Sequence, residues 1–262
     1  MGSKIDVLCT DFDKTIVSED TTIRLIKQII ASSSGDERRK IERLWTGLNS
    51  SYNLKIQRIY SAFVKTCYKD RIEALQDLSC KIQSLEIEST KKAFPIFRNV
   101  NRQMLYSEGK RVFIPKDVSE TFAKLKQEDI DIKIISMNWL RDILNGCLEG
   151  LVDDGDVFCN DLIFDEKGIA KRGIDIKICS PRDKLNVMNA FSLRKKVAYA
   201  GNGPIDIWCL LDADYGFLIR PSDSIIKLLM HLEIEPQRVN KHKEPGLYWV
   251  NSWSDIGNIL EL

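Results

Sequence analysis

The sequence has no long apolar run, no strong net charge and no closely paired cysteines. No apolar stretch approaches the roughly 18 to 20 residues that cross a bilayer, so we expect no membrane span. A net charge of +1 gives no electrostatic attraction to nucleic acid or to a membrane surface. The seven cysteines form no C-x-x-C pair, which is typical of reduced core residues in a reducing compartment. These absences favour a cytoplasmic protein with a small-molecule partner, and they leave its oligomeric state open.

What is present is an ordinary globular composition, with 44% hydrophobic and 29% charged residues. A chain of 262 residues can bury a sizeable core and is long enough for one domain with a large insertion or for two small domains.

A short apolar run at residues 5–9 ends in two aspartates, Asp11 and Asp13. The run predicts a buried parallel strand, and ligands of open α/β sheets bind beyond the carboxyl ends of such strands. Two acids so close together repel each other unless a cation lies between them, and Mg²⁺ prefers one or two carboxylates plus phosphate oxygens. The alternative is a solvated strand end at which Asp13 begins a turn.

Residues 20–107 have helical periodicity, which predicts a bundle of four or five helices. Asp20 is a candidate N-cap of the first helix, and Gly35 would end that helix. Pro95 is expected to kink a helix or to start the segment that follows. Alternation of strands and helices then resumes, with strands predicted at residues 130–136, 157–164 and 197–200 and a hairpin turn at residues 166–168.

Two later strand or helix boundaries carry polar residues. Ser136 and Asn138 follow the strand at residues 130–136, where either side chain could instead cap the next helix. Lys184 lies in the first turn of a helix that Ser180 and Pro181 begin. A cation there opposes the helix dipole, but it would neutralise a phosphate or a nucleophilic carboxylate. Lys171, Lys177 or a plain surface role for Lys184 are the alternatives.

The segment Asp11-Phe12-Asp13-Lys14-Thr15 resembles the DxDxT first motif of the haloacid-dehalogenase-like (HAD) superfamily. Residues 136–138, Lys184 and residues 201–206 resemble its later motifs, in the same order. The resemblance implies an α/β fold with a Rossmann-like parallel sheet and a helical cap inserted after the first strand. The core would comprise residues 1–19 and 108–262, and the cap residues 20–107.

The resemblance also implies a Mg²⁺-dependent phosphatase that hydrolyses a small-molecule phosphate monoester through an aspartyl-phosphate. Asp11 would be the nucleophile and Asp13 the general acid and base. The other implied roles are substrate binding by Thr15, Ser136, Met137, Asn138 and Lys184, and metal binding by Asp11, Asp13, Asn202 and Asp206. Asn202 replaces an acid of the family pattern, so the site loses a negative charge and should bind metal more weakly.

Four further segments, residues 20–21, 180–184, 206–216 and 247–253, are similar to the HAD domain of plant thiamine-monophosphate phosphatases and of related stand-alone proteins. Thiamine monophosphate is therefore a candidate substrate. Two other functions remain open: a phospho-ligand-binding or regulatory protein, which Asn202 favours, and a phosphomutase. No motif marks the residues that select the leaving group; the candidates are Glu19, Asp20, Trp45, Tyr52, Tyr60 and Asn138.

Overall fold

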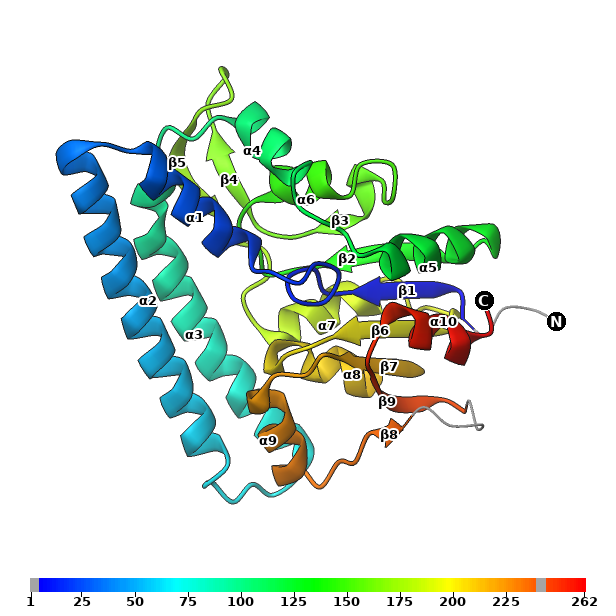
Figure 1. The fold of residues 1–262 in the computed structure, drawn as a ribbon. Coiled ribbons are helices and arrows are strands. Elements are labelled where there is room, and N and C mark those ends of the chain that lie inside the picture. Colours follow the sequence, from blue (N-terminus) through cyan, green and yellow to red (C-terminus); the bar gives the residue numbers. More distant parts are fainter. Residues whose placement is uncertain (1–4, 239–243) are drawn as a thin grey trace.

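A seven-stranded parallel sheet forms the centre of the computed structural model, which describes residues 5–238 and 244–262 (Figure 1). The strand order is β3-β2-β1-β6-β7-β9-β8. A separate antiparallel hairpin consists of β4 and β5. The strands are β1 (Val7–Thr10), β2 (Asp131–Ile135), β3 (Val157–Phe158), β4 (Asp161–Phe164), β5 (Ala170–Asp175), β6 (Val197–Gly201), β7 (Tyr215–Ile219), β8 (Gln237–Arg238) and β9 (Gly246–Val250).

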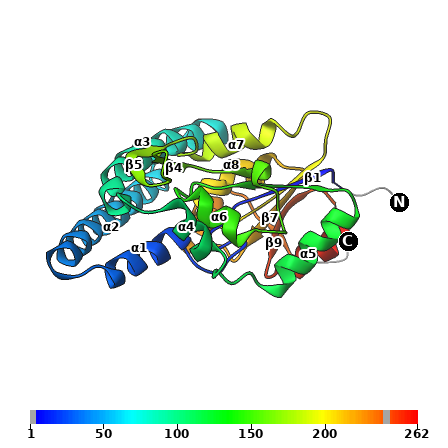
Figure 2. The ribbon, with the colours of Figure 1, turned by 90° about the horizontal axis from the view of Figure 1, so that it is seen from above.

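Helices cover both faces of the sheet (Figure 2). Leu8 of β1 belongs to the same apolar cluster as α5 (Lys116–Gln127) and α10 (Trp253–Leu260). Val7 and Cys9 belong to the cluster on the opposite face, with α7 (Pro181–Asn189) and α8 (Ile207–Asp212). Both faces are buried, so the parallel strands are continuous apolar runs rather than alternating ones. The remaining short elements are α6 (Arg141–Cys147), α9 (Asp223–His231), η1 (Asp154–Asp156) and η2 (Pro204–Asp206).

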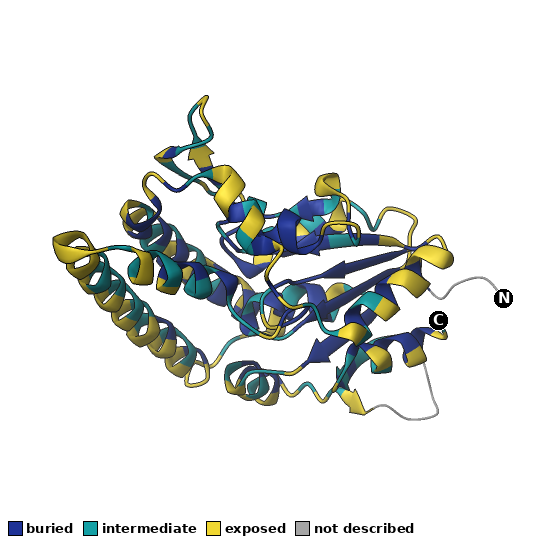
Figure 3. Ribbon diagram, turned by 45° about the horizontal axis from the view of Figure 1, so that its top comes forward, coloured by how far each residue is buried: buried dark blue, intermediate teal, exposed yellow. Residues whose placement is uncertain are grey.

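The chain leaves β1 and enters α1 (Thr21–Ser32), α2 (Gly35–Phe63) and α3 (Arg71–Phe97), which stand beyond the carboxyl ends of the central strands (Figure 1). The predicted helical segment is confirmed, and Asp20 caps α1 by accepting a hydrogen bond from the Ile23 amide. Pro95 lies inside α3, near its end, instead of starting a new helix. The outer face of α2 is exposed along its length (Figure 3). The division into core and cap at residues 19/20 and 107/108 stays a prediction.

The helical segment is joined closely to the sheet by α4 (Arg102–Gly109), which packs on α6. A Cβ at Gly109 would lie 2.2 Å from the Ile143 carbonyl oxygen, and a Cβ at Gly146 would lie 2.2 Å from that of Tyr106. Only glycine therefore permits this approach of the two helices.

One predicted strand, residues 157–164, is wrong as a single element. It is divided into β3, which joins the main sheet, and β4, which pairs with β5. Asn160 lies at the break and is buried. The hairpin turn predicted at residues 166–168 is confirmed, with Gly168 at φ +72°. Across residues 5–238 and 244–262, none of the helices combines the length and apolarity that a bilayer span requires.

Candidate active site

A cavity of about 390 Å³ lies where the carboxyl ends of the central strands meet the helical segment. Asp11, Lys184 and Asp206 line it from the sheet side. Trp45 of α2 and Glu86 of α3 line it from the helical segment. The cavity is therefore enclosed by both parts of the chain, as expected for a site between a sheet and a helical cover.

Asp11 lies at the end of β1, and its amide donates to the Ala200 carbonyl of β6 at 2.9 Å. The Thr15 hydroxyl donates to Asp11 Oδ2 at 3.3 Å, and Lys184 Nζ lies 2.7 Å from Asp11 Oδ1. Burial raises the pKa of Asp11 to about 6, although the positive charge of Lys184 acts in the opposite direction. Asp11 is thus ionised near neutral pH.

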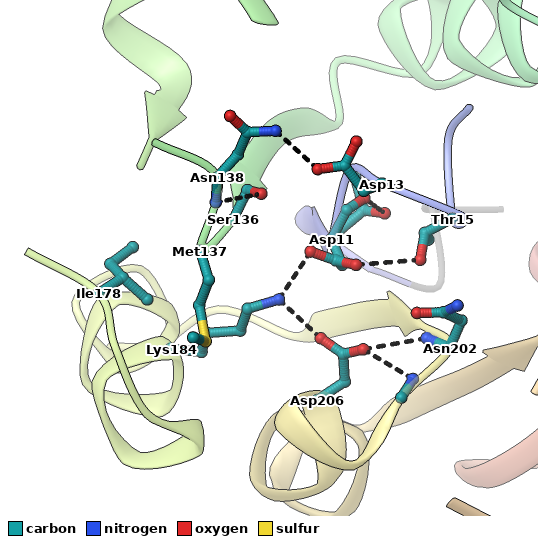
Figure 4. Close-up of polar contacts among 12 residues, drawn as sticks. Asp11, Asp13, Thr15, Ser136, Met137, Asn138, Ile178, Lys184, Asn202 and Asp206 are labelled. Carbon is teal, nitrogen blue, oxygen red and sulfur yellow. Dashed lines mark hydrogen bonds and ion pairs between the residues drawn. The ribbon is translucent and has the colours of Figure 1, made fainter. Parts of the chain in front are cut away.

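Lys184 lies between two carboxylates (Figure 4). Its Nζ is 2.7 Å from Asp11 Oδ1 and 2.8 Å from Asp206 Oδ1, and its side chain is buried. Burial by itself would lower the pKa of Lys184, but the charges of Asp11 and Asp206 outweigh it and hold that pKa above its usual range. The buried Tyr199 hydroxyl also donates to Asp206 Oδ1, at 2.8 Å. Lys184 is therefore a permanent cation beside Asp11.

Asp206 folds back on its own loop. Its Oδ2 accepts hydrogen bonds from the amides of Asn202 and Gly203, both at 3.0 Å (Figure 4). A Cβ at position 201 would lie 2.5 Å from Asp206 Cγ, so Gly201 leaves the space that this carboxylate occupies. The glycine thus positions Asp206 in the cavity wall.

Asp13 is held by the first residue of α1 and by the segment after β2. The Thr21 amide and hydroxyl donate to Asp13 Oδ1 at 2.8 and 2.9 Å. Asn138 Nδ2 donates to Asp13 Oδ2 at 2.7 Å (Figure 4). Burial, together with the negative charge of Asp20, raises the pKa of Asp13 to about 7. A carboxyl group with this pKa can give up and accept a proton near neutral pH.

Neither polar residue after β2 caps α6, which begins at Arg141 after Leu140. Ser136 Oγ accepts a hydrogen bond from the Asn138 amide at 3.1 Å, and Asn138 Oδ1 accepts one from the Leu140 amide at 2.8 Å. These local bonds hold the turn that aims Asn138 at Asp13.

Most of the predicted site residues meet in this cavity. Eight of them line it: Asp11, Asp13, Ser136, Met137, Asn138, Lys184, Asn202 and Asp206. Thr15 is fully buried behind Asp11, which it contacts through its hydroxyl group. Lys171 and Lys177, the alternatives to Lys184, are exposed and pair with Asp165 and Asp175.

Asp11, Asp13, Asn202 and Asp206 all line the cavity, and their metal-binding role stays a prediction. Within the described part of the chain, no group of three or more His, Cys, Asp or Glu side chains is arranged to hold a metal ion. The Asp13 carboxylate accepts hydrogen bonds from Thr21 and Asn138, and the Asp206 carboxylate accepts them from Lys184, Tyr199 and two backbone amides. Asp11, Asp206 and the Asn202 side chain lie on the cavity wall, and a metal held by Asp206 would replace one of these donors. Two carboxylates suffice for Mg²⁺ only when substrate and water oxygens complete its shell, and this donor set fits that pattern.

Sequence reasoning missed several residues that build or line the site, among them Thr21, Glu86, Asn160 and Tyr199. Asn160 Nδ2 donates to the Met137 and Ile178 carbonyls at 2.9 and 2.8 Å. Its Oδ1 accepts hydrogen bonds from the amides of residues 177 and 178. It therefore joins the segment after β2 to the segment before α7. A lone Asn between two apolar runs was the only signal for it.

The strand order, the helical insertion after β1 and the position of Asp11 give this chain the HAD fold that its motifs predicted. No protein-family model matches the chain. It is 23% identical to the bifunctional TH2 protein, mitochondrial, of Arabidopsis thaliana; the match covers 95% of this chain and 48% of that protein. The chain therefore spans about half the length of this curated relative.

Two solved structures illustrate the shared fold. A phosphoserine phosphohydrolase-like protein from Francisella tularensis superimposes with a TM-score of 0.58 at 14% identity, over 98% of this chain and 100% of that one. A substrate-bound phosphoserine phosphatase gives a TM-score of 0.54 at 17% identity, over 88% and 92% of the two chains.

Proposed function

We propose that this protein is a phosphoric monoester hydrolase that transfers the phosphoryl group of a small molecule first to Asp11 and then to water. The observation that carries this proposal is the placement of two aspartates in one cavity: Asp11 Oδ1 lies 2.7 Å from Lys184 Nζ, whereas the Asp13 carboxyl group is held by the neutral donors Thr21 and Asn138. One is suited to attack and the other to proton transfer. The phosphatase relatives in the same fold support it.

In the first step an Asp11 carboxylate oxygen forms a bond to phosphorus while the bond from phosphorus to the leaving oxygen breaks. Protonated Asp13 gives its proton to that oxygen, so the product leaves as an alcohol. In the second step Asp13 takes a proton from water, whose oxygen attacks phosphorus. The bond from phosphorus to Asp11 then breaks, which frees phosphate and restores both carboxyl groups.

Lys184 and Ser136 are proposed to bind the phosphoryl oxygens through the ammonium and hydroxyl groups. Met137 and Asn138 complete this wall, and the Thr15 hydroxyl orients Asp11. Asp11, Asp206 and Asn202 would hold Mg²⁺, which supplies positive charge against the phosphate when bound. Thiamine monophosphate is the candidate substrate from the sequence resemblance, and it belongs in the first substrate screen.

A second function, binding of a phospho-ligand without turnover, is favoured by Asn202, an amide where the family pattern has an acid. A screen of phosphate monoesters, para-nitrophenyl phosphate and thiamine monophosphate included, in Mg²⁺ and in EDTA separates the two functions. Turnover in Mg²⁺ supports the hydrolase; ligand binding with no phosphate release supports the binding protein.

Asp11→Asn tests the hydrolase directly. Because a neutral amide is a poor nucleophile, we expect phosphate release to be lost while the far-ultraviolet circular dichroism spectrum is unchanged. Asp36→Asn is the control, since Asp36 is exposed on α2 and is not one of the residues that line the cavity. Turnover by Asp11→Asn at the wild-type rate would overturn the proposal.

A further inference from the structure

Glu86 is a buried carboxyl group that the proposed reaction does not use. It lies on α3, is only 6% exposed and lines the cavity that contains Asp11 and Lys184. Burial raises the pKa of Glu86 to about 7, with a hydrogen bond from Tyr52 acting against that rise. A carboxylate in such surroundings is costly unless it is paired.

The partners of Glu86 leave it incompletely paired. The Tyr52 hydroxyl donates to Glu86 Oε1. Among the described residues, none donates a hydrogen bond to Oε2, and no Lys, Arg or His lies within ion-pairing distance of the carboxylate. Two residues further along α3, Glu88 shows the usual arrangement: its side chain is 40% exposed and pairs with Lys55 and Lys92. Glu86 therefore has capacity for a charged or donating group from outside the chain.

The charges that line the cavity also favour a ligand with a positively charged group. Five carboxyl groups but only two of the described ammonium groups, those of Lys14 and Lys184, line the cavity. The acids are Asp11, Asp13, Asp20, Glu86 and Asp206. Lys184 is already paired with two of these acids. A phosphate monoester adds further negative charge, so a ligand whose other end is positive would be favoured over a neutral one.

Aromatic side chains lie on the same walls. Trp45 and Tyr52 of α2 and Trp139, after β2, all line the cavity. Aromatic faces attract organic cations because the face of the ring carries partial negative charge. An anionic carboxylate beside aromatic rings is a combination suited to an organic cation more than to a sugar or a neutral alcohol.

We propose that Glu86, oriented by Tyr52, binds a positively charged group of the leaving alcohol, so that the preferred substrates are phosphate monoesters of cationic alcohols. This inference rests on the proposed phosphatase function and adds the substrate class to it. Phosphate would occupy the Lys184 end of the cavity and the cation the Glu86 end.

The test compares two esters that differ only in charge: phosphocholine and its neutral carbon isostere, 3,3-dimethylbutyl phosphate. We expect the wild-type protein to have a higher kcat/KM for phosphocholine. The trimethylammonium group has no N–H and interacts with Glu86 through its charge, so Glu86→Gln, which removes the opposite charge, should reduce that preference by roughly 10- to 100-fold. Thiamine monophosphate, also cationic, should lose a similar factor.

Glu88→Gln is the matched control, because it removes a carboxylate from the solvent side of the same helix, and it should keep the wild-type preference. Tyr52→Phe should lower the preference less than Glu86→Gln does. A wild-type protein with no preference for the cationic esters would overturn the inference. So would an equal loss for both esters in Glu86→Gln, which would indicate a structural role.

Calorimetric binding of the same two esters separates this inference from the proposed function. If wild-type protein binds phosphocholine more tightly than the isostere, and Glu86→Gln does not, Glu86 recognises the cation even if neither ester is hydrolysed. In that case only the phosphatase proposal fails. If both esters are hydrolysed with equal kcat/KM and bound equally well, only the inference about Glu86 fails.

Discussion

Asp11 and Asp13 are two residues apart and have the same side chain, yet their surroundings differ. Lys184 contacts Asp11, whereas the carboxylate of Asp13 accepts hydrogen bonds from the neutral groups of Thr21 and Asn138. The cation favours ionisation of Asp11, while the nearby negative charge of Asp20 raises the pKa of Asp13 further. At the scale of single residues, this difference separates the two proposed catalytic roles.

Asp13→Asn should lower turnover by roughly 10²- to 10⁴-fold, the usual contribution of a general acid and base. The loss should be smaller for para-nitrophenyl phosphate than for an alkyl phosphate, because nitrophenolate departs without a proton. Steady-state rates for a series of aryl and alkyl phosphates give the measurement. A loss that is independent of leaving-group pKa would assign Asp13 a structural or metal-binding role.

Asn202→Asp should strengthen Mg²⁺ binding, because a carboxylate adds a full charge to the wall formed by Asp11 and Asp206. Mg²⁺ should then raise the melting temperature of the variant more than that of the wild type. In EDTA the variant should melt lower, since a third carboxylate repels the other two. Equal Mg²⁺-induced shifts in the two proteins would place Asn202 away from the metal.

Contacts between elements, rather than single residues, keep the cavity walls in position. Asn160 joins the segment after β2 to the segment before α7, and Trp253 Nε1 of α10 donates to the Thr15 carbonyl in the loop after β1 at 3.0 Å. The Trp208 indole of α8 donates to Ser79 of α3 at 3.0 Å. The helical segment is thus tied to the sheet on the α8 side as well as through α4.

Gly146→Ala should destabilise the protein, because its Cβ would meet the Tyr106 carbonyl of α4 at 2.2 Å. Overpacking of this kind costs about 1 to 3 kcal/mol, which urea denaturation can measure. Gly47→Ala on α2 is the control: no atom lies within 4 Å of its Cβ, and alanine favours a helix more than glycine does. If Gly146→Ala is as stable as Gly47→Ala, α4 and α6 do not pack this closely.

The stability of the whole molecule should depend on the ionisation of Glu86. The pKa of Glu86 is about 7 in the folded protein, against an ordinary value of 4.5. Between these values the folded state binds a proton that the unfolded state has lost, so stability falls as pH rises and levels off above about pH 7. Tyr52, Tyr60 and Cys179, the titratable groups that interact with Glu86, all have pKa values raised by burial and stay neutral in this range.

Melting temperatures of the wild type and of Glu86→Gln at pH 5 and pH 8 measure this effect. The wild type should lose stability relative to the variant as pH rises, by at most about 3 kcal/mol, since one pKa unit corresponds to about 1.4 kcal/mol. Other titrating groups, including Asp11 and Asp13, are common to both proteins and cancel in the difference. Glu88→Gln should show no such trend, because the pKa of Glu88 is lowered to about 2. A constant difference between pH 5 and pH 8 would mean that Glu86 is not buried as described.

Local patterns in the sequence determined where the strands end and which polar side chains follow them. Asp11, Ser136 and Asp206 could be placed together in advance because parallel strands bring their carboxyl ends together, and Lys184 could be added because of the family resemblance. The N-cap at Asp20 and the hairpin turn at Gly168 were also predictable, because each depends on only a few consecutive residues.

Contacts between distant residues were decided only by the tertiary structure. Asn160 interrupts an apolar run that was predicted to be one strand. The reason is that its side-chain amide donates hydrogen bonds to the segment after β2 and to the segment before α7. The sequence indicates only that Tyr199 belongs to an apolar strand. The tertiary structure places Asp206 where the Tyr199 hydroxyl donates a hydrogen bond to it. Glu86 has the same spacing as other polar residues of α3, and only the packing of that helix turns it toward the cavity, where Tyr52 contacts it and no cation of the described residues does. Burial and the choice of partners are properties of the folded surroundings, so no local pattern can encode them.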